Sequence, residues 1–351
     1  MCVFEALDKS KFDVVMIGID RNGRWVRPRL EWLLEHKDNP REMKLESLGS
    51  TLSFLPDQAQ SPLVEAANRG ESVGPLDVIF PILHGTNGED GTVQGLLELA
   101  GVPYVGAGVL GSSVCMDKEM AKRVLRDAGL DVVPFQSVRR VDFEEEPKKI
   151  LDSAAAQFGY PYFVKPANAG SSVGVHKVKS APQARALFED AFQYDTKVIV
   201  EKAVDARELE VSVLGNHRPE ASIVGEIVPR HEFYTYEAKY LDPDGADLKI
   251  PAEDLSHEMQ KQIREMAVKA FRVLECWGFA RVDMFLDRRT GELFVNELNT
   301  IPGFTPISMY PKLWGATGIP YAQLLERLIE LAIERGDERR KLKLSFEAPK
   351  K

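Results

Sequence analysis

The sequence predicts an α/β protein, α+β overall, divided into two or three domains. The chain has 351 residues, more than most single domains contain. Its hydrophobic fraction of 44% is enough for a sizeable core, and short β-branched runs alternate with segments of helical periodicity. We place one domain in each of residues 1–113, 114–206 and 207–351.

Charge and cysteine usage exclude several classes of partner. Lys and Arg total 45 against 54 Asp and Glu, a formal net charge of −9, which argues against binding nucleic acid through its phosphates. No apolar run approaches the ~18 residues of a membrane span, so no membrane contact is expected. Cys2, Cys115 and Cys276 are too few and too far apart for a disulfide framework or a Cys-based zinc site. A reducing, cytoplasmic location is therefore expected.

The first domain is expected to be an open parallel sheet with helices. Asp13–Ile19 and Leu76–Leu83 are β-branched runs bounded by Gly, Asp and Pro, the pattern of buried parallel strands. Val93–Leu99 has helical periodicity and Val102–Val105 is a third short strand, which completes a strand–helix–strand unit. The polar stretch 36–75 is interpreted as peripheral loops and short helices.

The chain begins in an unusual way for such a sheet. Val3, Phe4 and Leu7 share one helical face, so residues 1–7 are interpreted as the end of a helix and not as a strand. We therefore expect the opening strand of the first sheet to be missing, with apolar edges exposed beside the 13–19 segment.

The second and third domains each combine strands with helices. In the second, Asp117 is placed to cap a helix that ends before Gly129. The elements that follow it are Tyr162–Ala167, a small-residue loop over 168–174, Val175–Val178, a helix over 181–192 and Lys197–Glu201. Those of the third domain are strand Glu208–Leu214, a long loop over 229–252, a helix through Met259 and Leu274, a hairpin of Ala280–Leu286 and Leu293–Asn299, and a helix over 320–334.

The hairpin provides the strongest chemical signal in the sequence. A register centred on the turn at Thr290 and Gly291 places Asp283 opposite Glu297. Opposed carboxylates repel each other unless they are solvated, protonated or bridged by a cation. Asn299 shares the face of Glu297, so the three side chains offer the hard oxygen ligands that Mg²⁺ takes. The alternative is three solvated polar residues on an open sheet face.

Two lysines suggest that an anion binds nearby. Lys165 lies within an apolar strand, where an uncompensated ammonium is costly, so a partner is implied; the alternative is an edge-strand lysine that discourages aggregation. Lys118 stands in the first turn of the helix capped by Asp117, where a cation opposes the helix dipole. Its alternative is an exposed lysine that costs little to tolerate. We expect neither lysine to have a partner within the protein.

The loop Gly170-Ser171-Ser172-Val173-Gly174 can bring backbone amides close to an anion, although a plain hairpin turn is the more frequent explanation. It is not a P-loop, because the lysine and hydroxyl residue that should follow the second glycine are absent. The spacings typical of zinc hydrolases, serine acyl transferases and dinucleotide-binding proteins are also absent. These reaction classes are therefore disfavoured.

Taken in order, these residues resemble a known family. The set is Lys118, Lys165, the 170–174 loop, Glu201-Lys202 with Glu208, Arg281-x-Asp283 and Asn296-Glu297-x-Asn299, and it resembles the motifs of ATP-grasp ligases. Three further runs are similar to the D-alanine–D-alanine ligase family: His84-Gly85-x-x-Gly88-Glu89-Asp90-Gly91, Tyr236-Glu237-Ala238-Lys239-Tyr240 and Asn299-Thr300-x-Pro302-Gly303-Phe304-Thr305. The similarity runs from about residue 3 to 335 and implies an ATP-grasp fold.

The resemblance implies a two-step reaction that supplies a peptidoglycan precursor. ATP phosphorylates the carboxylate of one D-alanine, and the amine of a second D-alanine attacks the acyl phosphate. For ATP, the residues implied are Lys118, Lys165 and Lys239 at the phosphates, the loop with Ser171 and Ser172 above them, Glu201 and Lys202 at adenine, and Glu208 at the ribose.

The resemblance also implies metal and substrate residues. Asp283, Glu297 and Asn299 would bind two Mg²⁺ ions, with Mn²⁺ as a possible replacement. Arg281 and the Gly303 amide would stabilise the tetrahedral oxyanion. The remaining residues implied are Ser171 and Tyr240 in catalysis, His84 near the first substrate, and Ser308 and Met309 at the second alanine. A homodimer is also expected.

Two alternatives stay open. The chain could ligate another D-amino or hydroxy acid; family members that form D-alanyl-D-lactate carry Phe where Tyr240 stands, so this tyrosine implies that an amine is accepted. It could also be a catalytically impaired nucleotide-binding remnant or a truncated form. The family begins with a strand and a turn whose glutamate holds the first alanine's ammonium, so a chain without them is expected to bind ATP but ligate poorly.

Overall fold

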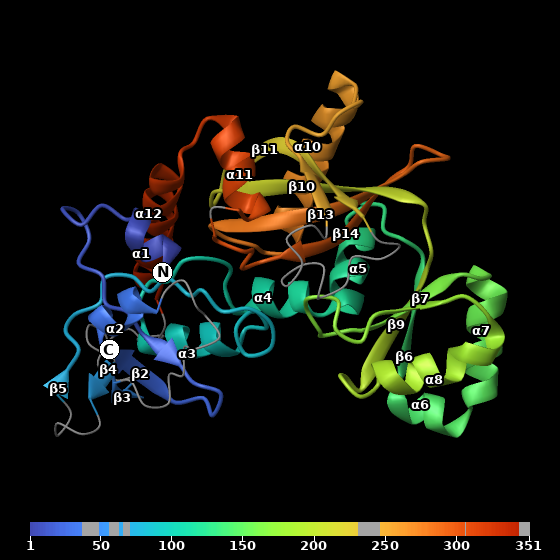
Figure 1. Cartoon of the computed structure of the whole chain (residues 1–351), viewed down its shortest axis with the longest axis horizontal. Coiled ribbons are helices and arrows are strands. Elements are labelled where there is room, and N and C mark those ends of the chain that lie inside the picture. The colour runs from blue at the N-terminus through green and yellow to red at the C-terminus, as the bar shows by residue number, and fades with distance from the viewer. Residues whose placement is uncertain (37–48, 56–62, 66–70, 231–245, 306, 344–351) are drawn as a thin grey trace, which may run out of the picture.

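The structure is a computed structural model that describes residues 1–36, 49–55, 63–65, 71–230, 246–305 and 307–343. Within these ranges the strands form three sheets, two of five strands and one of four (Figure 1). Helices pack against them, so the mixed α/β class predicted from the sequence is confirmed. No helix in these ranges is both long and apolar enough to cross a membrane.

The N-terminal sheet differs from the expected open parallel one. Its strands are all antiparallel neighbours in chain order: β1 (Gly18–Ile19), β2 (Trp25–Pro28), β3 (Gly49–Phe54), β4 (Leu63–Glu65) and β5 (Glu71–Ser72). The first two are joined by a tight turn in which Asp20 accepts hydrogen bonds from the amides of Asn22 and Arg24 at 2.8 and 2.9 Å. A short turn of this kind permits only antiparallel pairing. Most of the described residues in the stretch interpreted as loops and short helices therefore form strands.

The expected strands over 76–83 and 102–105 are not formed, and a single β-bridge connects the two segments. Ile79 and Tyr104 make an isolated parallel bridge, in which the amide of Ile79 donates to Pro103 at 2.8 Å. Val78 and Phe80 instead pack against a core that includes α12 (Tyr321–Arg340). Burial against a helix thus satisfies the apolar pattern that the sequence alone attributes to a sheet.

The helices of the N-terminal half follow the sequence more closely. The expected helix at the start is present as α1 (Cys2–Ala6), which lies beside α12 (Figure 1). Thr92–Ala100 forms α3 and ends at Gly101, whose φ of 69° is left-handed. Two further helices, α2 (Leu30–Glu35) and α4 (Val109–Met116), were not predicted.

The elements predicted for the central part of the chain occur in the predicted order, but the strand and two helices between residues 135 and 158 were not predicted. Helix α5 (Lys118–Asp127) is capped by Asp117, whose carboxylate accepts from the Met120 amide at 3.1 Å. The sheet runs β6-β9-β7-β8, with bounds Phe135–Arg139, Lys197–Lys202, Tyr162–Pro166 and His176–Val178. The helices of this lobe are α6 (Arg140–Glu145), α7 (Pro147–Phe158) and α8 (Ala181–Ala191) (Figure 1).

The third sheet carries the predicted hairpin. Its order is β12-β11-β10-β13-β14, with bounds Ala246–Lys249, Glu220–Pro229, Ala206–Leu214, Phe279–Asp287 and Leu293–Asn299. Helix α10 (His257–Val273) and α11 (Met309–Thr317) both pack on this sheet. Their apolar residues belong to separate core clusters, so the sheet is covered on both faces. The opposition of Asp283 and Glu297 is confirmed by the strand register.

Candidate active site

A cavity of about 1570 Å³ is lined by segments from the whole length of the chain. This is larger than most single-ligand pockets, so it has room for more than one small molecule. The predicted site residues that line it are His84, Lys118, Ser171, Glu208, Arg281, Asp283, Glu297, Asn299, Gly303, Ser308 and Met309. Residues predicted from separate motifs therefore meet at one place.

Four predicted residues do not line this cavity, namely Lys165, Ser172, Glu201 and Lys202. Lys202 is exposed at the end of β9. Lys239 and Tyr240 lie outside the described residues, so their roles stay predictions from the sequence.

One face of the third sheet carries a row of carboxylates. Glu210 on β10 pairs with Asp283 on β13, and Asp283 pairs in turn with Glu297 on β14. Neighbouring strands place directly paired residues on the same face. Glu210 was missed by the sequence analysis, although its position two residues after Glu208 in one strand is a signal that both side chains share a face.

Arg281 neutralises part of this row. Its guanidinium donates two hydrogen bonds to Asp283, both at 2.7 Å, and lies 3.2 Å from a carboxylate oxygen of Glu210. Burial alone would lower the pKa of Arg281, but these carboxylates outweigh it and raise the pKa well above its usual range. Arg281 is thus a permanent cation in a fixed orientation, as a bidentate pair requires.

The donor set on this face suits Mg²⁺. Asp283, Glu297 and Asn299 supply two carboxylates and an amide oxygen, all hard ligands. Among the described residues, no three His, Cys, Asp or Glu side chains are already arranged to hold a metal ion. Arg281 donates one hydrogen bond to each oxygen of Asp283, and each oxygen keeps a further lone pair with which it could bind an ion. The residues therefore fit the metal in chemistry.

Lys118 stands between this face and the glycine–serine loop. Its ammonium donates to the carbonyl of Ala169 at 2.6 Å and lies 3.8 Å from a carboxylate oxygen of Glu297. The expectation that Lys118 has no partner in the protein is therefore wrong. The reason is that the loop and β14, both distant in sequence, converge on the first turn of α5.

The loop itself has an unusual backbone. Ser171 and Ser172 have φ values of 54° and 59°, in the left-handed region that residues other than glycine rarely adopt. The sequence analysis attributed the loop's freedom to its two glycines, but only Gly174 has a positive φ, 67°. Backbone strain of this kind persists where surrounding structure holds it, and it is concentrated at ligand-binding sites.

Lys165 also has a partner, contrary to expectation. It lies 2.5 Å from one oxygen of Glu201, and Lys122 lies 2.8 Å from the other. Burial alone would raise the pKa of Glu201, but the two ammonium groups outweigh it and lower the pKa to about 2. Lys122 was missed, although it follows Lys118 by four residues and so lies on the same face of α5.

A fourth carboxyl group near Arg281, that of Glu89, has a raised pKa. Glu89 accepts a hydrogen bond from the amide of Gly85 at 2.5 Å, and burial raises its pKa to about 7 against the opposing effects of hydrogen bonds and of Arg281. Loss of hydration, together with the charge of Arg281, lowers the pKa of His84. Both residues come from the motif that begins at position 84.

Gly303, predicted as part of a motif, and Ser308, predicted as an isolated position, are neighbours in the structure. A Cβ atom at Gly303 would lie 2.7 Å from the Ser308 hydroxyl, closer than such atoms approach. That hydroxyl also contacts the hydroxyl of Thr305 at 2.8 Å. The absence of a side chain at 303 therefore lets the two segments pack together at the wall of the cavity.

Two family models match the chain. The model described as D-ala D-ala ligase N-terminus matches residues 1–107, and the model described as D-ala D-ala ligase C-terminus matches residues 124–330.

Curated proteins and solved structures agree with these models. D-alanine–D-alanine ligase A of Chromobacterium violaceum is 51% identical over 334 residues, which are 95% of this chain and 90% of that protein. The D-alanine-D-alanine ligase structure from Coxiella burnetii superimposes with a TM-score of 0.82 at 38% identity and covers 97% of this chain and 90% of its own. The VanG D-Ala:D-Ser ligase from Enterococcus faecalis has a TM-score of 0.81 at 36% identity, with coverages of 94% and 93%.

Proposed function

This chain belongs to the D-alanine–D-alanine ligase family, and we propose that it joins two D-alanines at the expense of ATP, by way of a D-alanyl phosphate. The observation that carries the proposal is the cavity in which Lys118, Arg281 and the opposed pair Asp283 and Glu297 meet. Phosphoryl transfer needs mainly positioning and charge neutralisation, and these side chains supply both.

The family uses ATP and Mg²⁺, and we infer how this chain would hold them. Bound Mg²⁺ would neutralise phosphate charge, with Asp283, Glu297 and Asn299 as ligands of two ions. Lys118 and the amides of the 170–174 loop would grip the phosphates, with Glu208 at the ribose and Lys202 at adenine. The support is that Lys118 and the loop are in direct contact beside the carboxylate row.

Glu201 and Lys165 need a revised role. Glu201 was expected to meet adenine, but its carboxylate is 2% exposed and is held between two lysines. We infer that Glu201 instead fixes Lys165 and Lys122 in the floor of the nucleotide site. Buried ammonium groups require such a counter-charge.

The residues that would contact the two substrates also line the cavity. Arg281 and Gly303 both line the cavity, and we infer that the guanidinium and the Gly303 amide would donate to an oxyanion as it develops, which is where preorganised donors accelerate acyl transfer most. His84, Ser308 and Met309 would contact the alanines. Catalytic roles for Ser171 and Tyr240, and phosphate binding by Ser172 and Lys239, rest on the sequence resemblance, as do a homodimer and a cytoplasmic location.

A second candidate differs only in the second substrate. The similarity to a D-Ala:D-Ser ligase at 36% identity favours testing D-serine as the second amino acid. The role predicted for Tyr240 favours an amine nucleophile over D-lactate.

The test is ADP release measured with ATP, Mg²⁺ and D-alanine, followed by mass spectrometry of the product. We expect ADP release that requires D-alanine, and a D-alanyl-D-alanine product. A mixture of D-alanine, D-serine and D-lactate at neutral pH then gives the preference directly. Predominant D-alanyl-D-serine would favour the second candidate, and predominant depsipeptide would contradict the role of Tyr240.

A further inference from the structure

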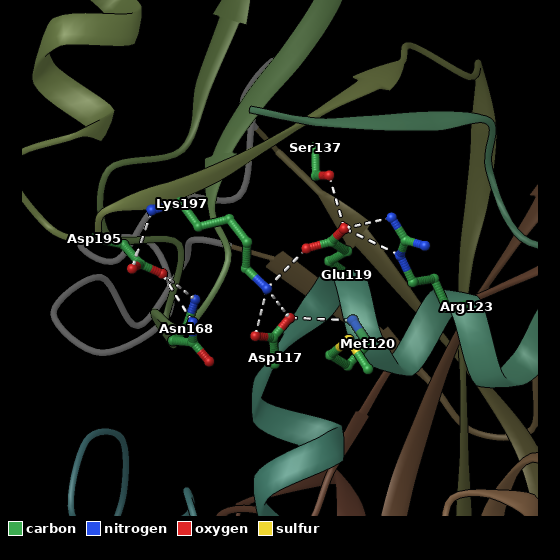
Figure 2. Close-up of polar contacts among 8 residues, drawn as sticks. All are labelled: Asp117, Glu119, Met120, Arg123, Ser137, Asn168, Asp195 and Lys197. Carbon is green, nitrogen blue, oxygen red and sulfur yellow. Dashed lines mark hydrogen bonds and ion pairs between the residues drawn. The ribbon is translucent and has the colours of Figure 1, made fainter. Parts of the chain in front are cut away.

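Lys197 is a buried lysine that lies outside the cavity. It is the first residue of β9, and its side chain is only 6% exposed. Its ammonium contacts both carboxylate oxygens of Asp117, at 2.8 and 2.6 Å, and one oxygen of Glu119 at 2.9 Å (Figure 2). Lys197 therefore connects the central sheet to the first turn of α5.

The two carboxylates that Lys197 holds are the sequence neighbours of Lys118. Asp117 also caps α5 through the Met120 amide, and Glu119 accepts from the Ser137 hydroxyl at 2.7 Å (Figure 2). Burial alone would raise the pKa of Glu119, but hydrogen bonds from Lys197, Ser137 and Arg123 outweigh it and lower the pKa to about 2. The backbone that carries Lys118 is thus fixed on both sides.

The same short segment of chain holds the start of the glycine–serine loop. Asp195, two residues before Lys197, accepts hydrogen bonds from the backbone and side-chain nitrogens of Asn168 at 2.8 and 3.0 Å (Figure 2). The amide of Ala167 donates to the carbonyl of Lys197 at 2.9 Å. Residues 167 and 168 are therefore anchored to residues 195–197 immediately before the loop begins.

The two anchored elements also contact each other. The backbone amide of Lys118 donates to the carbonyl of Ala167 at 2.9 Å, and its ammonium donates to Ala169 at 2.6 Å. Helix α5, the loop and β9 thus form a closed triangle of hydrogen bonds and ion pairs. Movement of any one side would change the distance between the Lys118 ammonium and the loop amides.

We propose that Asp195 and Lys197 are positioning residues that set the distance between Lys118 and the backbone amides of the 170–174 loop. This rests on the proposed function, because it assumes that both elements grip the phosphates of a nucleotide. Neither Asp195 nor Lys197 lines the cavity, so both act through the elements they hold. Misplacement by a fraction of an ångström weakens a preorganised site.

A purely structural role makes a different prediction. Buried ion pairs often contribute no more to stability than apolar side chains of similar volume, so the network is not required for packing alone. A structural role would change the melting temperature and leave nucleotide affinity unchanged in the folded protein. A positioning role changes the affinity, and does so only while Lys118 is present.

The experiment is a double-mutant cycle on the full chain with Lys197→Met and Lys118→Met. Binding of a non-hydrolysable ATP analogue with Mg²⁺ is measured by calorimetry, without D-alanine. We expect Lys197→Met to weaken binding roughly tenfold, the size typical of outer contacts that orient a ligand-binding side chain. In the Lys118→Met background, adding Lys197→Met should change the affinity by less than about twofold, because coupled residues are non-additive.

The matched control is Arg123→Met. Arg123 donates to the same Glu119 at 3.0 Å, but it is half exposed and contacts the carboxylate oxygen opposite to the one that Lys197 contacts. Its loss should leave the affinity within about twofold of wild type. An equal loss of affinity in Arg123→Met and Lys197→Met would contradict the proposal.

Asp195→Asn tests the second anchor and serves if Lys197→Met does not fold. It keeps the side-chain shape but weakens the charge-assisted bonds to Asn168. We expect affinity to fall about threefold and amide hydrogen exchange to increase in residues 168–174. Wild-type affinity in both variants, or additive effects in the cycle, would overturn the inference. A wild-type chain that binds no nucleotide would overturn the proposed function as well, which separates the two failures.

Discussion

Two clusters of charged side chains lie beside the cavity, and their majorities have opposite sign. One is on the face of β10, β13 and β14, and the other lies between helix α5 and the strands β7 and β9. On the first, Glu210, Asp283 and Glu297 surround the guanidinium of Arg281. On the second, Lys122 and Lys165 surround the carboxylate of Glu201. Each cluster contains a side chain of the opposite charge. Among the named residues, negative charges are in the majority in the first cluster and positive charges in the second.

This difference indicates which ligand fits both clusters at once. A carboxylate majority favours a metal cation, and a lysine majority favours a polyanion. The clusters approach each other where the Lys118 ammonium lies 3.8 Å from Glu297. A metal-bound polyphosphate has the required charges in the required order, so the protein's own charge distribution supports the proposed nucleotide site.

The largest effect is expected on the carboxylate side. Glu297→Gln keeps the shape and removes a charge that the proposed metal requires, so ADP release should fall roughly 10²- to 10³-fold while the melting temperature stays near that of wild type. Glu292→Gln, an exposed change in the turn of the same hairpin, is the matched control. Near-normal turnover of Glu297→Gln at ordinary Mg²⁺ would remove Glu297 from the metal site.

Loss of the carboxylate in the lysine-rich cluster should mainly lower the free energy of unfolding. Glu201→Gln leaves two buried ammonium groups without their carboxylate, so we expect a loss of about 3–5 kcal/mol in the free energy of unfolding.

Lys165→Met should weaken ATP binding with little change in stability, because Glu201 keeps its ion pair with Lys122. Denaturant unfolding and calorimetry measure the two quantities. A stability loss for Lys165→Met as large as for Glu201→Gln would show that Lys165 has a structural role instead.

A smaller effect is expected at Glu210. This carboxylate, 4% exposed, is the second acidic neighbour of Arg281. Glu210→Gln should leave the guanidinium less firmly oriented, so kcat should fall about tenfold while nucleotide affinity is unchanged. A rise in KM for ATP without a change in kcat would instead associate Glu210 with nucleotide binding.

The last effect concerns pH and Glu89, a fourth carboxyl group near Arg281. The pKa of Glu89 is about 7 in the folded protein, against an ordinary value of 4.5. The unfolded chain therefore releases this proton at lower pH than the folded chain, so stability falls as pH rises from about 4.5 to about 7. Glu89→Gln removes this loss. Its melting temperature relative to wild type should be higher at pH 8 than at pH 4.5, and a difference that is constant with pH would contradict the raised pKa.

The parts of the site predicted correctly are those fixed by local rules. The hairpin register follows from a turn and a period of two, which is why the opposition of Asp283 and Glu297 could be predicted. The cap at Asp117 likewise depends only on the residues that follow it.

The parts missed depend on contacts between segments distant in sequence. Glu201 meets Lys122 across 79 positions, and Lys197 meets Asp117 across 80. Neither pair leaves a spacing pattern. The N-terminal sheet differed from expectation for a related reason, because β-branched runs indicate burial but not the element against which they are buried.

The left-handed serines of the loop impose their own residue preferences. At Ser171 and Ser172 a glycine would reach the same backbone without steric cost, asparagine or aspartate with little, and valine or isoleucine only with strain. In β7, which ends at Pro166, the order is reversed, since β-branched residues favour strands. Homologous chains that keep this loop geometry should therefore vary among small and polar residues at these two positions, and among β-branched residues a few positions earlier. Selection on backbone shape alone produces this contrast, whichever nucleotide or substrate the chain binds.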